Sequence, residues 1–202
     1  MANYRTSRIL PVILVIVIII IAIAAMVSLA RVLFFSGSSN TSTTTTSDVS
    51  REALLNTAVG RSVSMTVRGP ITADEEFHSY QITVSNDSRS INTYTGYLQT
   101  VVANKTLGNN VASYEQFVYA LDKADLSNGK ELTGDKNDIR GICATGRVYE
   151  FKILKENKPV KSLWTSTCRG SQGSLDASVS QLTSLFVNQI PEADKLISKV
   201  SL

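Results

Sequence analysis

The feature that most constrains this chain is an unbroken apolar stretch near its start. Between Arg8 and Arg31 the sequence reads ILPVILVIVIIIIAIAAMVSLA, which is 22 residues without a charged side chain. A helix of this length extends roughly 33 Å, enough to cross a hydrocarbon core of about 30 Å. In lipid, every backbone N–H and C=O must be bonded within the segment, so a lone span has to be helical. With its apolar flank, the stretch predicts a transmembrane helix over residues 9–35.

The charges beside this stretch predict its orientation. Arg5, Arg8 and the α-amino group precede it, whereas Arg31 alone follows closely. The positive-inside rule therefore keeps residues 1–8 in the cytoplasm and exports the rest of the chain. We expect a single-pass protein of the plasma membrane, with the bilayer as a partner of residues 9–35 and an extracytoplasmic C-terminal part.

Two other N-terminal signals resemble this one. A cleaved signal peptide has an apolar core of about 7 to 15 residues, which is shorter than the stretch seen here. A type IV pilin or pseudopilin also begins with a short basic leader, but that leader ends in glycine, and a glutamate follows a few residues later. The segment before Arg31 contains neither residue. The pattern therefore favours an uncleaved signal anchor.

The composition changes after the apolar stretch. Residues 36–47, SGSSNTSTTTTS, carry no charge and no large apolar side chain, so they cannot bury enough surface to offset the entropy of ordering. We expect a flexible tether with an r.m.s. span of about 20 Å. Residues 48–202 then form the predicted extracytoplasmic domain.

The charge balance of this domain argues against a nucleic-acid partner. All 17 acidic residues lie beyond residue 47, and removing Arg5, Arg8 and Arg31 from the 20 basic residues leaves 17. The domain is therefore neutral, whereas proteins that bind nucleic acids need a cationic face.

Helical and strand-like periodicities are mixed along the domain. Alternation of apolar and polar residues predicts strands over 61–68, 78–84, 90–97, 147–154 and 160–166. Helical spacing predicts helices over 48–59, 113–124, 175–190 and 192–200. The expected fold class is α+β, an antiparallel sheet of four to five strands with helices on one face.

The two cysteines, Cys143 and Cys168, flank the predicted hairpin of 147–154 and 160–166. They lie equally far from a point beside Glu156 in its connection. Antiparallel pairing brings equidistant residues together, so the two sulfurs should meet. Thiols oxidise outside the cytoplasm, and a bond that closes about 25 residues should stabilise the domain by roughly 3 to 4 kcal/mol. The spacing predicts a structural disulfide.

The sequence offers little that could carry catalysis. His78 is the single histidine of the chain, and Glu75 and Glu76 beside it are typical of a solvated turn. No spacing of Cys and His matches a zinc site, and the glycines form no phosphate-binding motif. We expect no cofactor, no metal and no enzymatic activity.

A possible binding surface lies around the predicted hairpin. It comprises Trp164, Lys155, Lys158 and Lys161. The lysines are equally typical of a solvated hairpin end. The aromatic residues could form a platform for a sugar or peptide, but a core layer beneath a helix is the interpretation we favour. Tyr149, Phe151 and Ile153 share one face by alternation, and the helix predicted over 175–190 is their natural cover.

Three segments carry a resemblance to other proteins. GICATGRVYEF, SLWTSTC and LFVNQIP together resemble uncharacterised single-pass surface proteins of small-genome bacteria. This resemblance implies a membrane-anchored protein and assigns no activity or site residue.

These observations favour a non-catalytic, membrane-anchored binding or assembly module of the cell envelope, with a protein or glycan partner. A surface hydrolase with an unrecognised site and a pilin-like or secretion-apparatus subunit are the alternatives. A pocket that groups His78 with a nucleophile or carboxylate would favour the enzyme. A bare sheet edge or an exposed apolar patch would favour assembly.

Overall fold

A computed structural model describes residues 46–202 of the chain. The predicted anchor over residues 9–35 and most of the predicted tether lie outside this range and stay predictions. Within residues 46–202, no helix combines the length and hydropathy that a membrane crossing requires.

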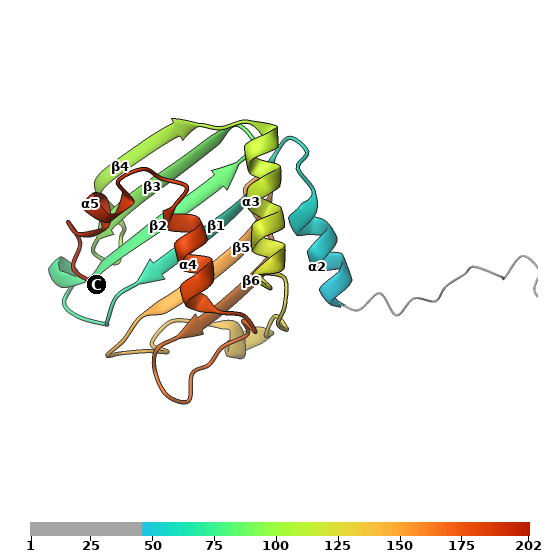
Figure 1. The fold of residues 1–202 in the computed structure, drawn as a ribbon. Coiled ribbons are helices and arrows are strands. Elements are labelled where there is room, and N and C mark those ends of the chain that lie inside the picture. The colour runs from blue at the N-terminus through green and yellow to red at the C-terminus, as the bar shows by residue number, and fades with distance from the viewer. Residues whose placement is uncertain (1–45) are drawn as a thin grey trace, which may run out of the picture. The chain divides into compact units, whose positions relative to one another are not determined.

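One antiparallel sheet of six strands forms the centre of the domain (Figure 1). The strands are β1 (Arg61–Arg68), β2 (His78–Ser85), β3 (Ser88–Thr95), β4 (Thr100–Gly108), β5 (Val148–Lys155) and β6 (Lys158–Ser166). Their order is β4-β3-β2-β1-β5-β6. The α+β class is confirmed. The expected number of four to five strands is wrong, because the sequence pattern did not reveal β4.

Among the described residues, four α-helices accompany the sheet, and Figure 1 shows α3 and α4 lying across one of its faces. They are α2 (Thr46–Leu55), α3 (Val111–Lys123), α4 (Val179–Val187) and α5 (Ala193–Ile197). The helix predicted over 175–190 begins later than expected, because Ser178 caps α4 by accepting a hydrogen bond from the Gln181 amide. Leu175 instead forms an isolated β-bridge with Gly129.

The alternation of β1 explains how the two faces of the sheet differ. Val63, Met65 and Val67 point toward the helices and are at most 1% exposed. In the register of the sheet, Met65 lies beside Ile82 of β2 and Phe151 of β5, so an apolar layer runs across the central strands. The opposite face of β1 carries small hydroxyl residues.

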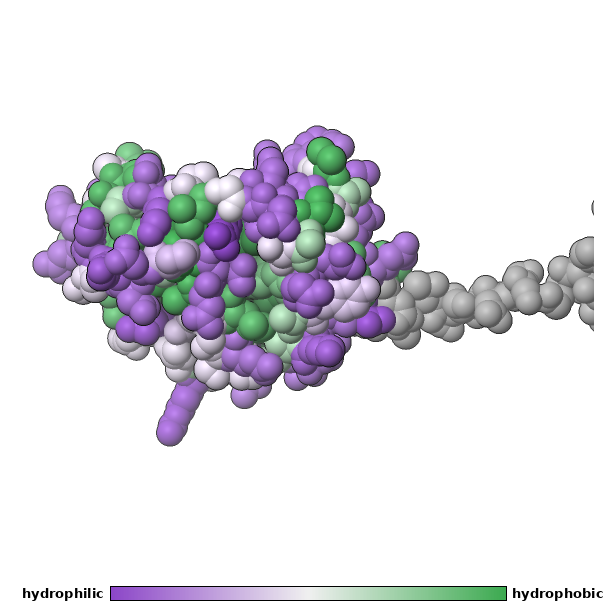
Figure 2. All heavy atoms as spheres, turned by 45° about the horizontal axis from the view of Figure 1, so that its top comes forward, coloured by the Kyte–Doolittle hydropathy of each residue, from purple (hydrophilic) through white to green (hydrophobic). Residues whose placement is uncertain are grey.

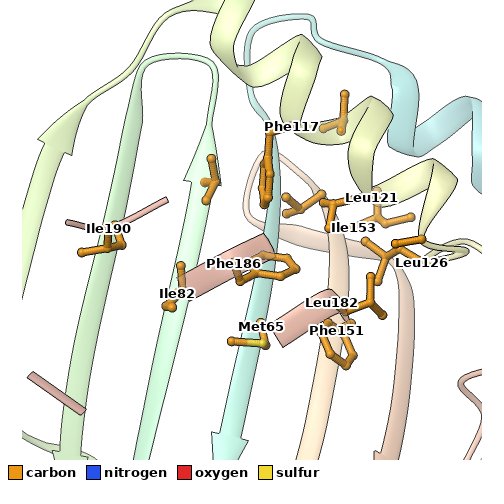
Figure 3. Close-up of a cluster of buried hydrophobic side chains, with 14 of the residues drawn as sticks. Met65, Ile82, Phe117, Leu121, Leu126, Phe151, Ile153, Leu182, Phe186 and Ile190 are labelled. Carbon is orange, nitrogen blue, oxygen red and sulfur yellow. The ribbon is translucent and has the colours of Figure 1, made fainter. Parts of the chain in front are cut away.

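Phe186 of α4 lies at the centre of the hydrophobic core (Figure 3). Its ring meets Phe117 of α3 edge to face, with 5.2 Å between the ring centroids, and lies 6.0 Å from the ring of Phe151. The expectation that this helix covers Phe151 is confirmed. Burial also raises the pKa of Tyr80 to about 12 and raises the pKa of Tyr114, so both phenols stay neutral in the core.

The predicted hairpin is confirmed as β5 and β6. Glu156 and Asn157 connect the strands, and both adopt positive φ, at 51° and 62°. A two-residue connection with two left-handed residues matches the right-handed twist of the flanking strands.

On the side of the domain drawn in Figure 2, hydrophobic residues are scattered among polar ones.

Candidate functional site

The disulfide predicted between Cys143 and Cys168 is confirmed. The S–S distance is 2.05 Å and the two Cα atoms lie 5.5 Å apart. Gly146 packs against the bond so closely that an added Cβ would lie 2.9 Å from the Cys143 sulfur and 2.3 Å from Thr167 Oγ1. The Arg147 amide donates to the same Thr167 hydroxyl at 2.9 Å. The bond therefore fixes the segment before β5 against the end of β6.

A second segment, from Gly69 to Phe77, is hydrogen-bonded to the loop that contains Cys143 of the disulfide. The Gly69 amide donates to the His78 carbonyl at 3.0 Å, and the Ile71 amide donates to the Ala144 carbonyl at 2.9 Å. Pro70 stops the strand because it lacks the N–H that a ladder needs. The connection between β1 and β2 is thereby held beside the disulfide loop.

The turn between β3 and β4 forms the third wall. The Tyr97 ring stacks on the Phe77 ring with 4.2 Å between centroids and an interplanar angle of 14°. Its hydroxyl donates to the Thr72 carbonyl at 2.8 Å, and its amide donates to Asp74 Oδ1 at 2.7 Å. Gly96 has φ of 74° and lies against the same carboxylate, where a side chain would be crowded. Tyr97 is therefore fixed in place although its side chain is about half exposed.

The three segments enclose a groove of about 570 Å³. By strand alternation, Arg68 and Val148 of its lining lie on the sheet face opposite to the one that α3 and α4 cover. The apolar members of the lining are Ile71, Phe77, Tyr97, Ile139, Ile142 and Val148, together with the disulfide sulfur of Cys143. Its polar side chains are Arg68, Gln99 and Arg140.

Exposed apolar side chains continue the groove onto the surface. Ile71 is 46% exposed, Tyr97 is 48% exposed and Leu98 next to it is 92% exposed. We call these three residues the apolar rim. Leaving large apolar side chains in water is unfavourable, and Ile71 and Tyr97 of the rim also line the groove, so this exposed group is a candidate contact surface.

The charges at the groove are already paired. Arg68 lies 3.4 Å from a carboxylate oxygen of Glu150, and that carboxylate also pairs with Lys152 at 2.9 Å. Hydrogen bonds from Arg140 lower the pKa of Asp138 to about 2, and the same contact raises the pKa of Arg140. The groove therefore presents apolar surface bordered by neutralised ion pairs.

The four residues of the possible binding surface form an exposed pair and a buried pair. Lys155 and Lys158 lie exposed at the hairpin end. Trp164 is 3% exposed and Lys161 is 4% exposed, so neither has surface to offer a partner. The indole is covered because residues 173–175 pack on β6, with the Ser174 and Leu175 amides both donating to the Trp164 carbonyl. An added Cβ at Gly173 would lie 2.7 Å from the indole.

Lys161 is a buried cation with a structural contact. Its Nζ donates to the Ser127 carbonyl at 2.8 Å and to the Gly129 carbonyl at 3.2 Å. Burial lowers the pKa of this amine. The side chain therefore ties the loop after α3 to the sheet, and the sequence pattern gave no sign that this lysine differs from its exposed neighbours.

The residues that could carry catalysis are not assembled. His78 is the first residue of β2, and within residues 46–202 its imidazole makes no hydrogen bond or ion pair. Glu75 and Glu76 are exposed in a short 3₁₀ helix. The described part of the chain contains no group of three His, Cys, Asp or Glu side chains that could hold a metal ion. The groove lining includes no carboxylate and no imidazole.

Comparison with known proteins adds one partial likeness. No protein-family model matches the chain. A methionyl-tRNA formyltransferase from Endomicrobium trichonymphae is 31% identical over 84 residues, which is 40% of this chain. The matched part is 26% of that enzyme, so the chain spans about a quarter of the length of the relative it resembles.

Proposed function

We propose that this chain is a non-catalytic binding module of the cell envelope, anchored in the membrane by residues 9–35, whose disulfide-bordered groove receives an apolar side chain of a partner protein. The observation that carries the proposal is the groove itself, with the apolar rim of Ile71, Tyr97 and Leu98 beside it. It lies on an extracytoplasmic domain in the topology expected from the flanking arginines.

The size and lining of the groove favour a protein partner over a glycan. A volume of about 570 Å³ lies within the range of ligand pockets and can hold one or two large side chains. Sugars need several directed hydrogen bonds, whereas here the polar side chains are Gln99 and two paired arginines. Apolar and aromatic surface at the centre of a contact, with charges confined to its border, is typical of protein interfaces.

The walls of the groove are fixed in advance of binding. The disulfide, the stacked Phe77 and Tyr97 rings and the hydrogen bond from Ile71 to Ala144 each hold one wall. Because these groups are already ordered, a partner would not have to offset the entropy of ordering them. The ordered walls therefore support a specific contact surface rather than a flexible apolar end of the domain.

Photocrosslinking in intact cells tests the proposal. A photoreactive residue is placed at Leu98, and a second version of the full chain carries it at Val59, which is also 92% exposed. Leu98 follows β3 at the groove end of the sheet, whereas Val59 precedes β1 at the opposite end. We expect a discrete protein adduct from position 98 and none of the same mass from position 59.

A matched pair of charge substitutions shows whether the groove is responsible. Ile71→Asp places a charge in the groove at a residue that is 46% exposed, and Val160→Asp places one on β6 at a residue that is 45% exposed. Ile71→Asp should abolish the adduct from position 98, and Val160→Asp should leave it intact. Equal adducts from positions 98 and 59, an adduct that survives Ile71→Asp, or labelling of lipid alone would contradict the proposal.

A further inference from the structure

One edge of the sheet is open to another strand. β4 is the outermost strand on its side, and within residues 46–202 no backbone hydrogen bond joins it to any segment other than β3. It is nine residues long, contains no proline and alternates between more and less exposed side chains. Unpaired N–H and C=O groups along such an edge form a template for strand addition.

The opposite edge of the same sheet is closed. β6 carries Pro159, which has no N–H to offer, and exposed Lys158 beside it. Further along, the amides of Ser174 and Leu175 occupy the Trp164 carbonyl. A proline, an exposed lysine and a covering segment are features by which proteins prevent strand pairing at a sheet edge, and β6 has all three.

The one charged residue of β4, Lys105, does not prevent strand pairing at the open edge. Lys105 lies on the helix side of the sheet, where its Nζ donates to the Pro191 carbonyl at 2.8 Å and lies 3.8 Å from Glu192. A bulge at Val102 interrupts the pairing with β3, because Thr93 pairs with Ala103 and Tyr94 pairs with Val101. The bulge is local, and the residues from Ala103 to Gly108 keep a regular ladder.

We propose that β4 pairs with β4 of a second copy of this chain, antiparallel and about a two-fold axis. In such a pair one residue lies opposite its own copy. The midpoint of Thr100–Gly108 is Asn104, and an axis there places Ala103 opposite Lys105, so residues 103–105, which follow the bulge, form the centre of the pair. An axis at Lys105 would place two like charges opposite each other, which is destabilising.

The net charge of the domain supports a second copy of the chain as the partner of β4. With 17 acidic and 17 basic residues beyond the anchor, two copies approach without net repulsion. Asn104 and Thr106 are exposed and uncharged, so the facing surfaces are compatible with themselves. This pairing uses the outer edge of β4, which begins directly after the turn of Tyr97 and Gln99 at the groove, and it does not rest on the proposed function.

Cysteine crosslinking of the full chain in membranes of the producing cells tests the pairing. Asn104→Cys places two thiols opposite each other, at the Cα separation of about 4.5 to 5.5 Å that a disulfide accepts. Thr106→Cys is the matched control on the same strand and face, because its two copies would lie roughly 13 Å apart. We expect disulfide-linked dimers from Asn104→Cys to form at least about tenfold faster than from Thr106→Cys or Val160→Cys.

A charge pair gives an independent measurement that does not depend on added thiols. When two differently tagged copies are co-expressed, Asn104→Asp in both should reduce their co-purification, because two carboxylates would then face each other. Val160→Asp, on β6 at the opposite edge of the sheet, should leave it unchanged. Equal crosslinking at all three positions, faster crosslinking of Thr106→Cys, or co-purification insensitive to Asn104→Asp would overturn the proposal, whereas loss of the groove adduct by Ile71→Asp would not affect it.

Discussion

Replacing Phe186 with alanine should lower the free energy of unfolding of the full-length chain by about 3 to 5 kcal/mol. The ring is fully buried and joins α4 to both α3 and β5 through Phe117 and Phe151. Its removal would lose the transfer free energy of the ring and leave a cavity that the surrounding rigid helices and strands cannot fill. Urea unfolding in detergent, followed by the fluorescence of the single tryptophan, measures the change.

A conservative substitution shows whether the loss of stability comes from lost packing of the ring or from any change at this position of α4. Phe186→Leu keeps much of the apolar volume, so it should cost clearly less than Phe186→Ala in the same measurement. Exposed positions typically tolerate substitution within about 0.5 kcal/mol. If Phe186→Ala stayed within that limit, the ring would not lie at the centre of the core.

Removing the disulfide should lower the free energy of unfolding by about 3 to 4 kcal/mol, because the bond closes a long loop and restricts the unfolded chain. The double variant Cys143→Ala and Cys168→Ala is compared with the oxidised parent chain by urea unfolding. Adding reductant to the parent should reproduce most of the loss, and adding it to the double variant should change nothing. A parent chain whose stability is unaffected by reductant would contradict a stabilising bond.

The strongest periodic patterns of the sequence correspond to the central elements. β1 was predictable because strict alternation places Val63, Met65 and Val67 on one face, and such a strand has to bury that face. The disulfide was predictable because its cysteines are symmetric about a hairpin. Both inferences rest on local strand geometry, namely the alternation of side chains along a strand and the pairing of residues across a hairpin.

β4 escaped the same reasoning because it is an edge strand. Its side chains toward the helices are Ala103, Lys105 and Leu107, and the lysine occupies a position where a central strand would carry an apolar residue. An edge needs little burial on either face, so its alternation is weak. The later start of α4 follows from the cap at Ser178 together with the pairing of Leu175 with Gly129, a tertiary contact that helical periodicity does not encode.

The groove could not be predicted because its walls come from three separate connections. Phe77, Tyr97 and Ile142 lie far apart in the sequence, and each is preceded or followed by residues that indicate only a turn. Trp164, a member of the possible binding surface, is buried for a related reason, because residues 173–175 return to cover the indole. Loops that fold back over a sheet are set by tertiary packing and leave no periodic signal.

We propose that an N-terminal span holds the chain in the membrane while the domain folds in an oxidising space. Thiol labelling of intact producing cells, followed by membrane fractionation, tests it most directly. We predict that the full chain stays with the alkaline-washed membrane and that Cys143 and Cys168 react only after reductant is added. A full-length chain recovered in the soluble cytosolic fraction, with both thiols labelled before reductant, would contradict the account.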